Sequence, residues 1–275
     1  MKLEKLSNFV KRPGPLVFIV MDGIGDTDKI EGNAVKSALT PTLDKLKKTA
    51  LYTRIKAHGT AVGLPDDTDM GNSEVGHNAF GAGRVFAQGA KLVNKSIESG
   101  SLFRGEVWNN LINNCKANNS KLHFLGLFSD GNVHSNISHL KAMIIKAAEL
   151  GIKDICVHIL LDGRDVGETS ALEYVDPFEE FIKETNSKYN VNCRIASGGG
   201  RMKITMDRYE ADWNMVKLGW DTHIHGNARK FRSAREAIET YRKEINGVID
   251  QDLPAFVIVN DAGEPLGKVT DGDSF

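Results

Sequence analysis

Short apolar runs alternate along most of the chain with segments of helical period. Runs of about four to eight residues rich in Val, Ile, Leu and Phe are typical of buried strands. We predict strands at 16–21, 122–128, 154–161, 193–196 and 256–259. We predict helices that start at Thr40-Pro41, cover 137–148 and 169–184, include Trp213, and cover 233–245. Gly151 is suited to end the second of these helices, and Pro177 predicts a kink or a break in the third.

Strands that alternate with helices imply βαβ units and a parallel sheet, which is the α/β class. Polar loops directly follow three of the predicted strands, at 129–135, 162–165 and 197–201. Because ligands bind outside the carboxyl ends of parallel strands, we expect the polar side chains of these loops to converge on one edge. The side chains concerned are His134, Arg164, Asp165 and Arg201. Two guanidinium groups and an imidazole suit a phosphate or a carboxylate ligand.

The segment 58–89 is rich in Gly, Asp and Asn and predicts a long irregular loop, which is usually functional. Within it, Ser73 has two interpretations. It is either the N-cap of a short helix or a nucleophile whose developing negative charge a helix N-terminus stabilises. Asp22 ends the first predicted strand, where it either caps a turn or ligates a metal ion. Together Asp22 and Ser73 suggest metal-dependent phosphoryl transfer. We interpret His77 as a hydrogen-bonded supporting residue.

The strand-end loops also have ordinary structural interpretations. Arg164 and Asp165 could form an ion pair with each other, although Gly163 would let the backbone approach a ligand. The Ser197-Gly-Gly-Gly-Arg201 segment could be a flexible loop or a phosphate cradle, but it lacks the pattern of a dinucleotide site. Arg208 could line the same pocket or form a salt bridge in solvent.

The composition excludes several classes of protein. The chain has 35 basic and 36 acidic residues and a net charge of −1, which argues against nucleic-acid and membrane-surface binding. Three widely spaced cysteines without a Cys-x-x-Cys pair indicate a reducing compartment, with no disulfide or zinc framework. His58 and His123 have no partner at ligand spacing, and we treat both as structural. Without a signal-peptide core or an apolar run of about 18 residues, we expect a cytoplasmic protein. We also expect it to be a monomer.

Five stretches of the chain resemble the cofactor-independent phosphoglycerate mutases, members of the alkaline-phosphatase-like metalloenzymes. They are VMDGIG at 20–25, HGTAVGLPDDTDMGNSEVGHNAFGAGRV at 58–85, GLFSDGNVHS at 126–135, LDGRDV at 161–166 and ASGGGRMKITMDRYEADW at 196–213. The ASGGGR form is most similar to the plant and trypanosomatid branch. The resemblance implies the N-terminal part of an alkaline-phosphatase-like domain over 1–87. It also implies an inserted α/β transferase domain, nearly complete, over 88–275.

The resemblance also implies roles for single residues. Ser73 would be the nucleophile that becomes phosphoserine, and it would contact one of two Mn²⁺ or Mg²⁺ ions together with Asp22. The residues at the family's substrate-holding positions are His134, Arg164, Asp165, Arg201 and Arg208. The implied reaction interconverts 3- and 2-phosphoglycerate in glycolysis and gluconeogenesis, with the serine carrying the phosphoryl group while glycerate turns. Asp165 would act as base for the glycerate hydroxyl and the arginines would clamp the substrate, while the metals would lower the pKa of the serine.

One departure from the family concerns the C-terminal end. In the family the phosphatase-like domain resumes after the transferase domain and supplies most of the metal ligands, whereas this sequence stops at Phe275. We therefore expect a C-terminally truncated mutase with little or no activity alone, whose first strand, 16–21, lacks neighbours. The alternatives are a non-catalytic phosphoglycerate-binding module and another phosphomutase or phosphatase of the same superfamily.

Overall fold

The computed structural model describes residues 7–21, 24, 26–207 and 209–275, which form two compact units, Met1–Ile55 and Lys56–Phe275. The first unit contains α1 (Ala34–Ser37) and α2 (Pro41–Thr49). Helix α2 begins as predicted, with Thr40 at the N-cap and Pro41 in the first turn. No helix within the described ranges is long and apolar enough to cross a membrane.

The strand predicted at 16–21 is not formed. These residues have no regular secondary structure, and Leu16 and Ile19 are 94% and 76% exposed. A strand is stable only when a neighbour pairs with its backbone groups, and within the described part of the chain no strand pairs with this segment. An apolar run is therefore not sufficient for a strand.

The second unit is built on a five-stranded sheet with the strand order β1-β2-β3-β5-β4. Its strands are β1 (Leu122–Leu127), β2 (Asp154–Leu161), β3 (Asn192–Gly200), β4 (Arg229–Phe231) and β5 (Phe256–Ile258). Strands β1, β2 and β3 are parallel, as predicted. Strand β5 is antiparallel to β3 and parallel to β4. The α/β class is confirmed, but the sheet is mixed, because β4 and β5 run antiparallel to β1, β2 and β3.

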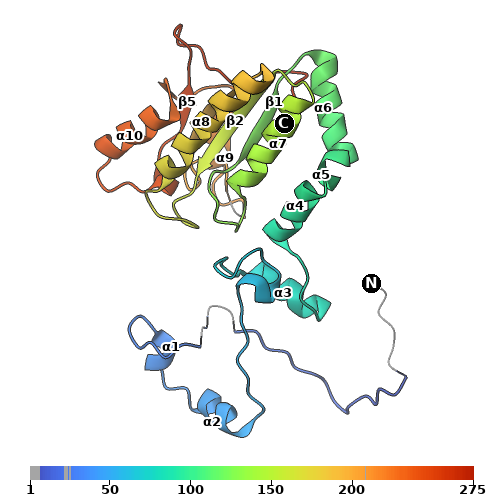
Figure 1. Ribbon diagram of the computed structural model, residues 1–275. Helices are drawn as coiled ribbons and strands as arrows, with labels where there is room; N and C mark the ends of the chain where they lie inside the picture. The colour runs from blue at the N-terminus through green and yellow to red at the C-terminus, as the bar shows by residue number, and fades with distance from the viewer. Residues whose placement is uncertain (1–6, 22–23, 25, 208) are drawn as a thin grey trace. The chain divides into compact units, whose positions relative to one another are not determined.

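Helices cover both faces of this sheet (Figure 1). The helices α7 (Ile137–Glu149), α8 (Ala171–Tyr189) and α10 (Ala234–Glu244) lie on one face, and α9 (Trp213–His223) lies on the other. The elements that precede the sheet are η1 (Gly59–Val62), α3 (Ser73–Ala82), α4 (Gly89–Glu98), α5 (Ser101–Arg104) and α6 (Glu106–Asn118), and η2 (Asp250–Asp252) precedes β5. We predicted a kink or a break at Pro177; the break is wrong, because α8 continues through Pro177, and the kink stays a prediction. Burial of the adjoining Val175 and Phe178 in the core outweighs one missing backbone hydrogen bond.

The central strand β2 is buried on both faces, which explains its nearly continuous apolar sequence. Side chains of a strand alternate between the two faces of a sheet. Ile155, Val157 and Ile159 accordingly belong to the core under α7, α8 and α10. His158 and Leu160 point to the opposite face, where α9 and the loop before it lie. This second face carries most of the buried polar side chains discussed below.

Strand β3 is longer than predicted, because it continues through all three glycines to Gly200. The interpretation of this segment as a flexible loop is therefore wrong, whereas its interpretation as a phosphate cradle stays a prediction. A Cβ added at Gly198 would lie 2.6 Å from the Phe256 ring, and one at Gly200 would lie 2.2 Å from the backbone oxygen of Gln251. The glycines allow the chain's own elements to pack closely against β3.

Candidate functional site

The loops that follow β1, β2 and β3 are joined by hydrogen bonds at the carboxyl end of the sheet. The Ser129 hydroxyl donates to Asp162 Oδ2 at 2.6 Å. Arg201 Nη1 donates to Asp162 Oδ1 at 2.7 Å and to Asp165 Oδ2 at 2.6 Å. The predicted convergence of the three strand-end loops is thus observed for Asp165 and Arg201, with Asp162 between them.

Asp162 is the buried anchor of this group. Its Oδ1 also accepts the backbone N–H groups of Arg164 and Asp165 at 3.2 and 3.1 Å. Burial would raise the pKa of Asp162, but Ser129, the Asp165 N–H group and Arg201 outweigh burial and hold it below its ordinary value. Sequence reasoning did not single out Asp162, although its place as the first polar residue after β2 is a usable signal.

Arg201 is held by two carboxylates but keeps donors for a further ligand. Its side chain is 7% exposed, and within the described residues its recorded hydrogen bonds come from Nη1 alone. A guanidinium group has five N–H donors in a planar fork, so Nε and Nη2 can bind another anion. The two ion pairs hold the plane of the fork, which suits bidentate recognition of a phosphate or a carboxylate.

Arg164 does not pair with Asp165, which pairs with Arg201. The Arg164 side chain is exposed, and its Nη1 lies 4.0 Å from the sulfur of Met202. Gly163 lets the chain's own segments pack closely against it, and its interpretation as a point of ligand approach stays a prediction. A Cβ there would meet Asp250 Cβ and the Gln251 nitrogen, each at 3.0 Å. Arg164 therefore stands at the rim of the Asp162–Arg201 group as an exposed cation.

His134 lies in the loop after β1 and is exposed. It lines a hollow of about 240 Å³ along β1 and α7, together with Phe124 and Met143. No contact between His134 and Arg201 is recorded in the described part of the chain. The same loop reaches the segment before α3, because Asn132 Nδ2 donates to Asp69 Oδ1 at 2.6 Å.

Ser73 is exposed and is the first residue of α3, but it is not the N-cap. Asn72 is the N-cap, since its side chain accepts from the Val75 N–H group at 3.0 Å. His77 Nδ1 lies 2.7 Å from the Ser73 carbonyl oxygen and 3.2 Å from Ser73 Oγ. A carbonyl can only accept, so Nδ1 carries the proton and cannot take the one on Ser73 Oγ. In this geometry His77 supports the first turn of α3 and is not a base for the serine.

Two predicted site residues, Asp22 and Arg208, lie outside the described residues. Within the described residues no group of three or more His, Cys, Asp or Glu side chains is arranged to hold a metal ion. The described residues therefore do not make a metal centre by themselves, and the predicted contacts of Asp22 and Ser73 with metal ions remain predictions.

Comparison with known proteins identifies the family. The family model described as BPG-independent PGAM N-terminus matches residues 93–275, well over half of the chain. The chain belongs to the 2,3-bisphosphoglycerate-independent phosphoglycerate mutase family. A probable mutase of this kind from Leptospira interrogans is 54% identical over 276 residues, covering 100% of this chain and 50% of the relative. An Arabidopsis thaliana mutase is 48% identical, with 98% of this chain and 49% of the relative covered.

A solved structure agrees with this assignment. The phosphoglycerate mutase of Leishmania mexicana, determined at low cobalt concentration, superposes with a TM-score of 0.85 at 47% identity. The match covers 92% of this chain and 46% of that chain. The chain thus spans about half the length of the curated relatives that it matches, among which are the plant and trypanosomatid proteins expected from the ASGGGR stretch. The predicted domain boundary at residue 87 remains a prediction.

Proposed function

We propose that this chain supplies the substrate-holding part of an enzyme that interconverts 3-phosphoglycerate and 2-phosphoglycerate. The observation that carries the proposal is Arg201, whose guanidinium group is held by Asp162 and Asp165 with two nitrogens left for an anion. Phosphoglycerate carries a carboxylate and a phosphate, both of which suit such a fork. Arg164 at the rim supplies a second cation. Membership of the mutase family supports this choice of substrate over other phosphorylated acids.

In this proposal two other residues act on the reacting atoms. Ser73 carries the phosphoryl group, and its place in the first turn of α3 supports this role, because backbone N–H groups at a helix N-terminus stabilise negative charge. Asp165 takes the proton of the glycerate hydroxyl while its other interaction, with Arg201, holds its position. His134 and Arg208 complete the proposed set of substrate ligands.

The proposal also includes a divalent metal requirement, with Mn²⁺ or Mg²⁺ as the ions and Asp22 and Ser73 as ligands. The Leishmania enzyme was crystallised in the presence of cobalt, which supports metal dependence in the family. Because the described residues do not form a metal centre, we assign no step of the reaction to these ions.

Substrate binding is tested by isothermal titration of the 275-residue chain with 3-phosphoglycerate. The informative variant is Arg164→Ala, because this side chain is exposed and its loss leaves the buried ion pairs intact. A hydrogen bond to a charged group contributes about 1.5–3 kcal/mol, so we expect the affinity to fall roughly tenfold to a hundredfold. Arg235→Ala, which removes an exposed arginine of α10, is the matched control and should bind like the wild type. If Arg164→Ala and the wild type bound 3-phosphoglycerate with equal affinity, the proposal that this group of residues binds the substrate would be refuted.

The role of Ser73 is tested by intact-protein mass spectrometry after incubation with 3-phosphoglycerate and Mn²⁺. We expect any phosphoryl group that the wild type gains to lie on Ser73, so that Ser73→Ala gains none. A phosphoryl group on another residue, or an equal gain in the variant, would contradict the assignment. Stronger binding of a phosphopentose than of phosphoglycerate would assign the chain to another phosphomutase of the superfamily.

A further inference from the structure

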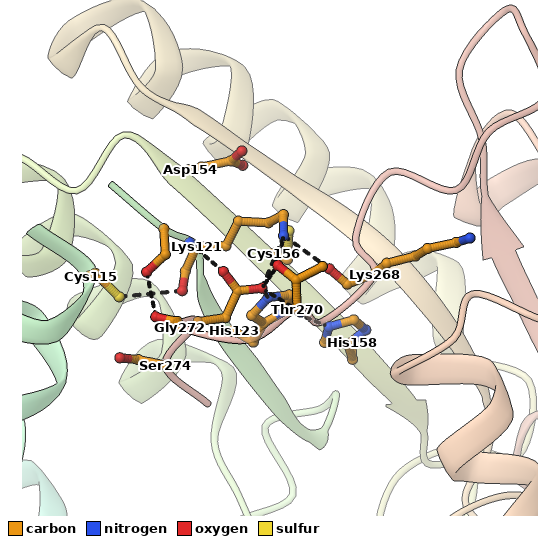
Figure 2. A network of polar contacts seen from close by, with 12 residues as sticks. Cys115, Lys121, His123, Asp154, Cys156, His158, Lys268, Thr270, Gly272 and Ser274 are labelled. Atoms are coloured by element: carbon orange, nitrogen blue, oxygen red, sulfur yellow. Dashed lines mark hydrogen bonds and ion pairs between the residues drawn. The ribbon is translucent and has the colours of Figure 1, made fainter. Parts of the chain in front are cut away.

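A continuous row of hydrogen-bonding side chains, most of them buried, crosses the sheet on the face that α9 covers. Its members are, in order, Asp273, His123, His158, Ser197, His223 and Thr205, and we call them the imidazole chain. The first contacts are 3.2 Å from Asp273 Oδ2 to His123 Nε2, and 3.0 Å from His123 Nδ1 to His158 Nε2. Ser197 Oγ lies 2.6 Å from His158 Nδ1 and 2.8 Å from His223 Nδ1. His223 Nε2 lies 3.1 Å from Thr205 Oγ1. Figure 2 shows the end of the chain at His123 and His158.

One arrangement of protons satisfies every contact while all three rings stay neutral. The Asp273 carboxylate can only accept, so His123 carries its proton on Nε2 and accepts at Nδ1. His158 must then donate from Nε2 and accept the Ser197 hydroxyl proton at Nδ1. The Ser197 oxygen accepts from His223 Nδ1, and His223 Nε2 accepts from the Thr205 hydroxyl. Every donor therefore points toward Asp273, and the negative charge at that end determines the direction of the whole chain.

The surroundings keep the three rings neutral. Burial is the largest cause that lowers the pKa of each histidine, and it lowers that of His223 to about 4. Two cations, Lys121 immediately before β1 and Arg194 of β3, act in the same direction on His123. The other ionisable groups on this side are Asp154 and Cys156 of β2, and Asp154 pairs with Arg194. The carboxylate that the chain contacts, Asp273, is itself held by Lys121 at 2.9 Å.

A β-bulge brings the Ser197 hydroxyl into the chain. The register between β2 and β3 shifts between Val157 and His158, so that His158 pairs with Ser197 and not with Ala196. Without the extra residue, Ala196 would stand beside His158 and the row of hydrogen bonds would stop there. The phenyl ring of Phe275 stacks parallel to His123 and His158, with centroids 5.8 and 5.9 Å away. The chain is thus a built feature that involves three strands, α9 and the C-terminal turn.

The far end of the imidazole chain holds the segment that follows Arg201. Thr205 has a φ of 72°, a left-handed conformation that is a genuine outlier for a β-branched residue. It is held against α9 by its N–H group, which donates to the Met215 carbonyl at 3.2 Å, and by its hydroxyl, which donates to His223. Gly219 of α9 makes room for it, because a Cβ there would lie 2.3 Å from Thr205 Oγ1. Strain of this kind persists only where the surroundings enforce it.

We propose that the imidazole chain positions residues 201–207 for substrate binding, and that His223 and Thr205 are positioning residues for Arg201. The inference deepens the proposed function and rests on it, because it takes Arg201 as a ligand of phosphoglycerate. The chain connects this segment to β1, β2 and the Asp273 turn through groups that are almost completely buried. Its loss should therefore loosen residues 201–207 without unfolding the sheet.

The proton arrangement is tested first, by NMR correlation of the imidazole nitrogens with their ring protons at pH 7. We expect the Nε2–H tautomer for His123 and His158 and the Nδ1–H tautomer for His223, each assigned with a single histidine-to-Asn variant. A proton on Nδ1 of His158, or on Nε2 of His223, would overturn the one-directional chain. This measurement needs no substrate and does not depend on the proposed function.

The positioning role is tested with Thr205→Val, Thr205→Ser and Thr222→Val. The first removes the hydroxyl, and the second restores it on a smaller side chain. The third is the matched control, because Thr222 is a buried threonine next to His223 whose hydroxyl donates to the Leu218 carbonyl within α9 and not to the chain. We expect amide hydrogen exchange over 201–207 to accelerate roughly tenfold in Thr205→Val, the effect of one hydrogen bond, with β1 and β2 unchanged. Thr205→Ser and Thr222→Val should resemble the wild type.

The affinity for 3-phosphoglycerate should change in the same variants as the amide exchange rate. It should fall roughly tenfold in Thr205→Val and return to the wild-type value in Thr205→Ser. Equal exchange over 201–207 in Thr205→Val and the wild type would overturn the proposal, as would a change spread evenly over the whole sheet. If the wild type does not bind 3-phosphoglycerate, the proposed function fails, and the exchange measurement alone decides whether the chain positions this segment.

Discussion

Acidification should destabilise the second unit through its buried histidines, and His223 allows the effect to be estimated. The pKa of His223 is lowered by burial from about 6.5 to about 4. Between these two values the unfolded chain binds a proton that the folded chain does not, so the free energy of unfolding falls as the pH falls. The contribution is fully present above about pH 7 and is lost by about pH 4. At about 1.4 kcal/mol per pH unit, His223 alone accounts for about 3 kcal/mol.

The assay is urea-induced unfolding, followed by circular dichroism, at half-unit steps from pH 7 to pH 4. The informative variant is His223→Asn, whose amide nitrogen occupies the position of Nδ1 and can still donate to Ser197. The variant should be less stable than the wild type at pH 7, because Thr205 loses its acceptor and packing is lost. The difference should shrink by about 3 kcal/mol at pH 4, since the variant has no imidazole to protonate there. His225→Asn, which removes an exposed ring two residues further on, should follow the wild type. Parallel curves for wild type and His223→Asn would refute the reasoning.

Three further predictions concern packing, charge and thiols. Gly200→Ala should lower the free energy of unfolding by at least about 2 kcal/mol, because the methyl would lie 2.2 Å from a backbone oxygen. Gly126→Ala places its methyl in open space and should lower the free energy of unfolding by less than about 1 kcal/mol. Urea-induced unfolding of both variants checks this. Arg201→Met should cost about 3–5 kcal/mol in the same assay, because a buried carboxylate loses its cation. Burial raises the pKa of Cys156 to about 11 and that of Cys193 to about 12, so a thiol reagent at pH 8 should label these thiols only after unfolding.

Much of the fold was accessible from local sequence patterns. The strand at 154–161 was predicted to the residue, because a buried strand in a parallel sheet is apolar on both faces. Helix α10 was predicted within one residue at each end, since Ser233 is a cap and the apolar face has a clear period. The strand predicted at 16–21 did not form. Its apolar run favours a strand, but a strand is stable only when other strands pair with it, and the resemblance to the family already implied that this segment lacks such neighbours.

The sequence predicted which residues of the candidate site lie at one edge of the sheet, because this depends on the topology of the strands. It did not predict which of these side chains pair with one another. That Asp165 and Arg201 would lie at one edge followed from parallel strands. The parallel strands did not predict that Asp165 pairs with Arg201, 36 residues away, and not with its neighbour Arg164. Asp162 was overlooked because an Asp-Gly pair after a strand is commonly a turn. His123 was treated as an isolated structural residue, since its partner His158 is 35 residues distant.

The sequence by itself determined the family, the α/β class and the alternation of strands, helices and polar loops over 122–201, because these depend on residue types at short, regular spacing. The tertiary structure alone decided three matters. It placed the three glycines inside β3, where neighbouring segments pack against them. It shifted the register of β3 so that Ser197 meets His158. It also joined three histidines from β1, β2 and α9 into one chain of hydrogen bonds that ends on Asp273. Each outcome depends on contacts between residues far apart in the sequence, whose geometry is defined only when the sheet and its helices pack together.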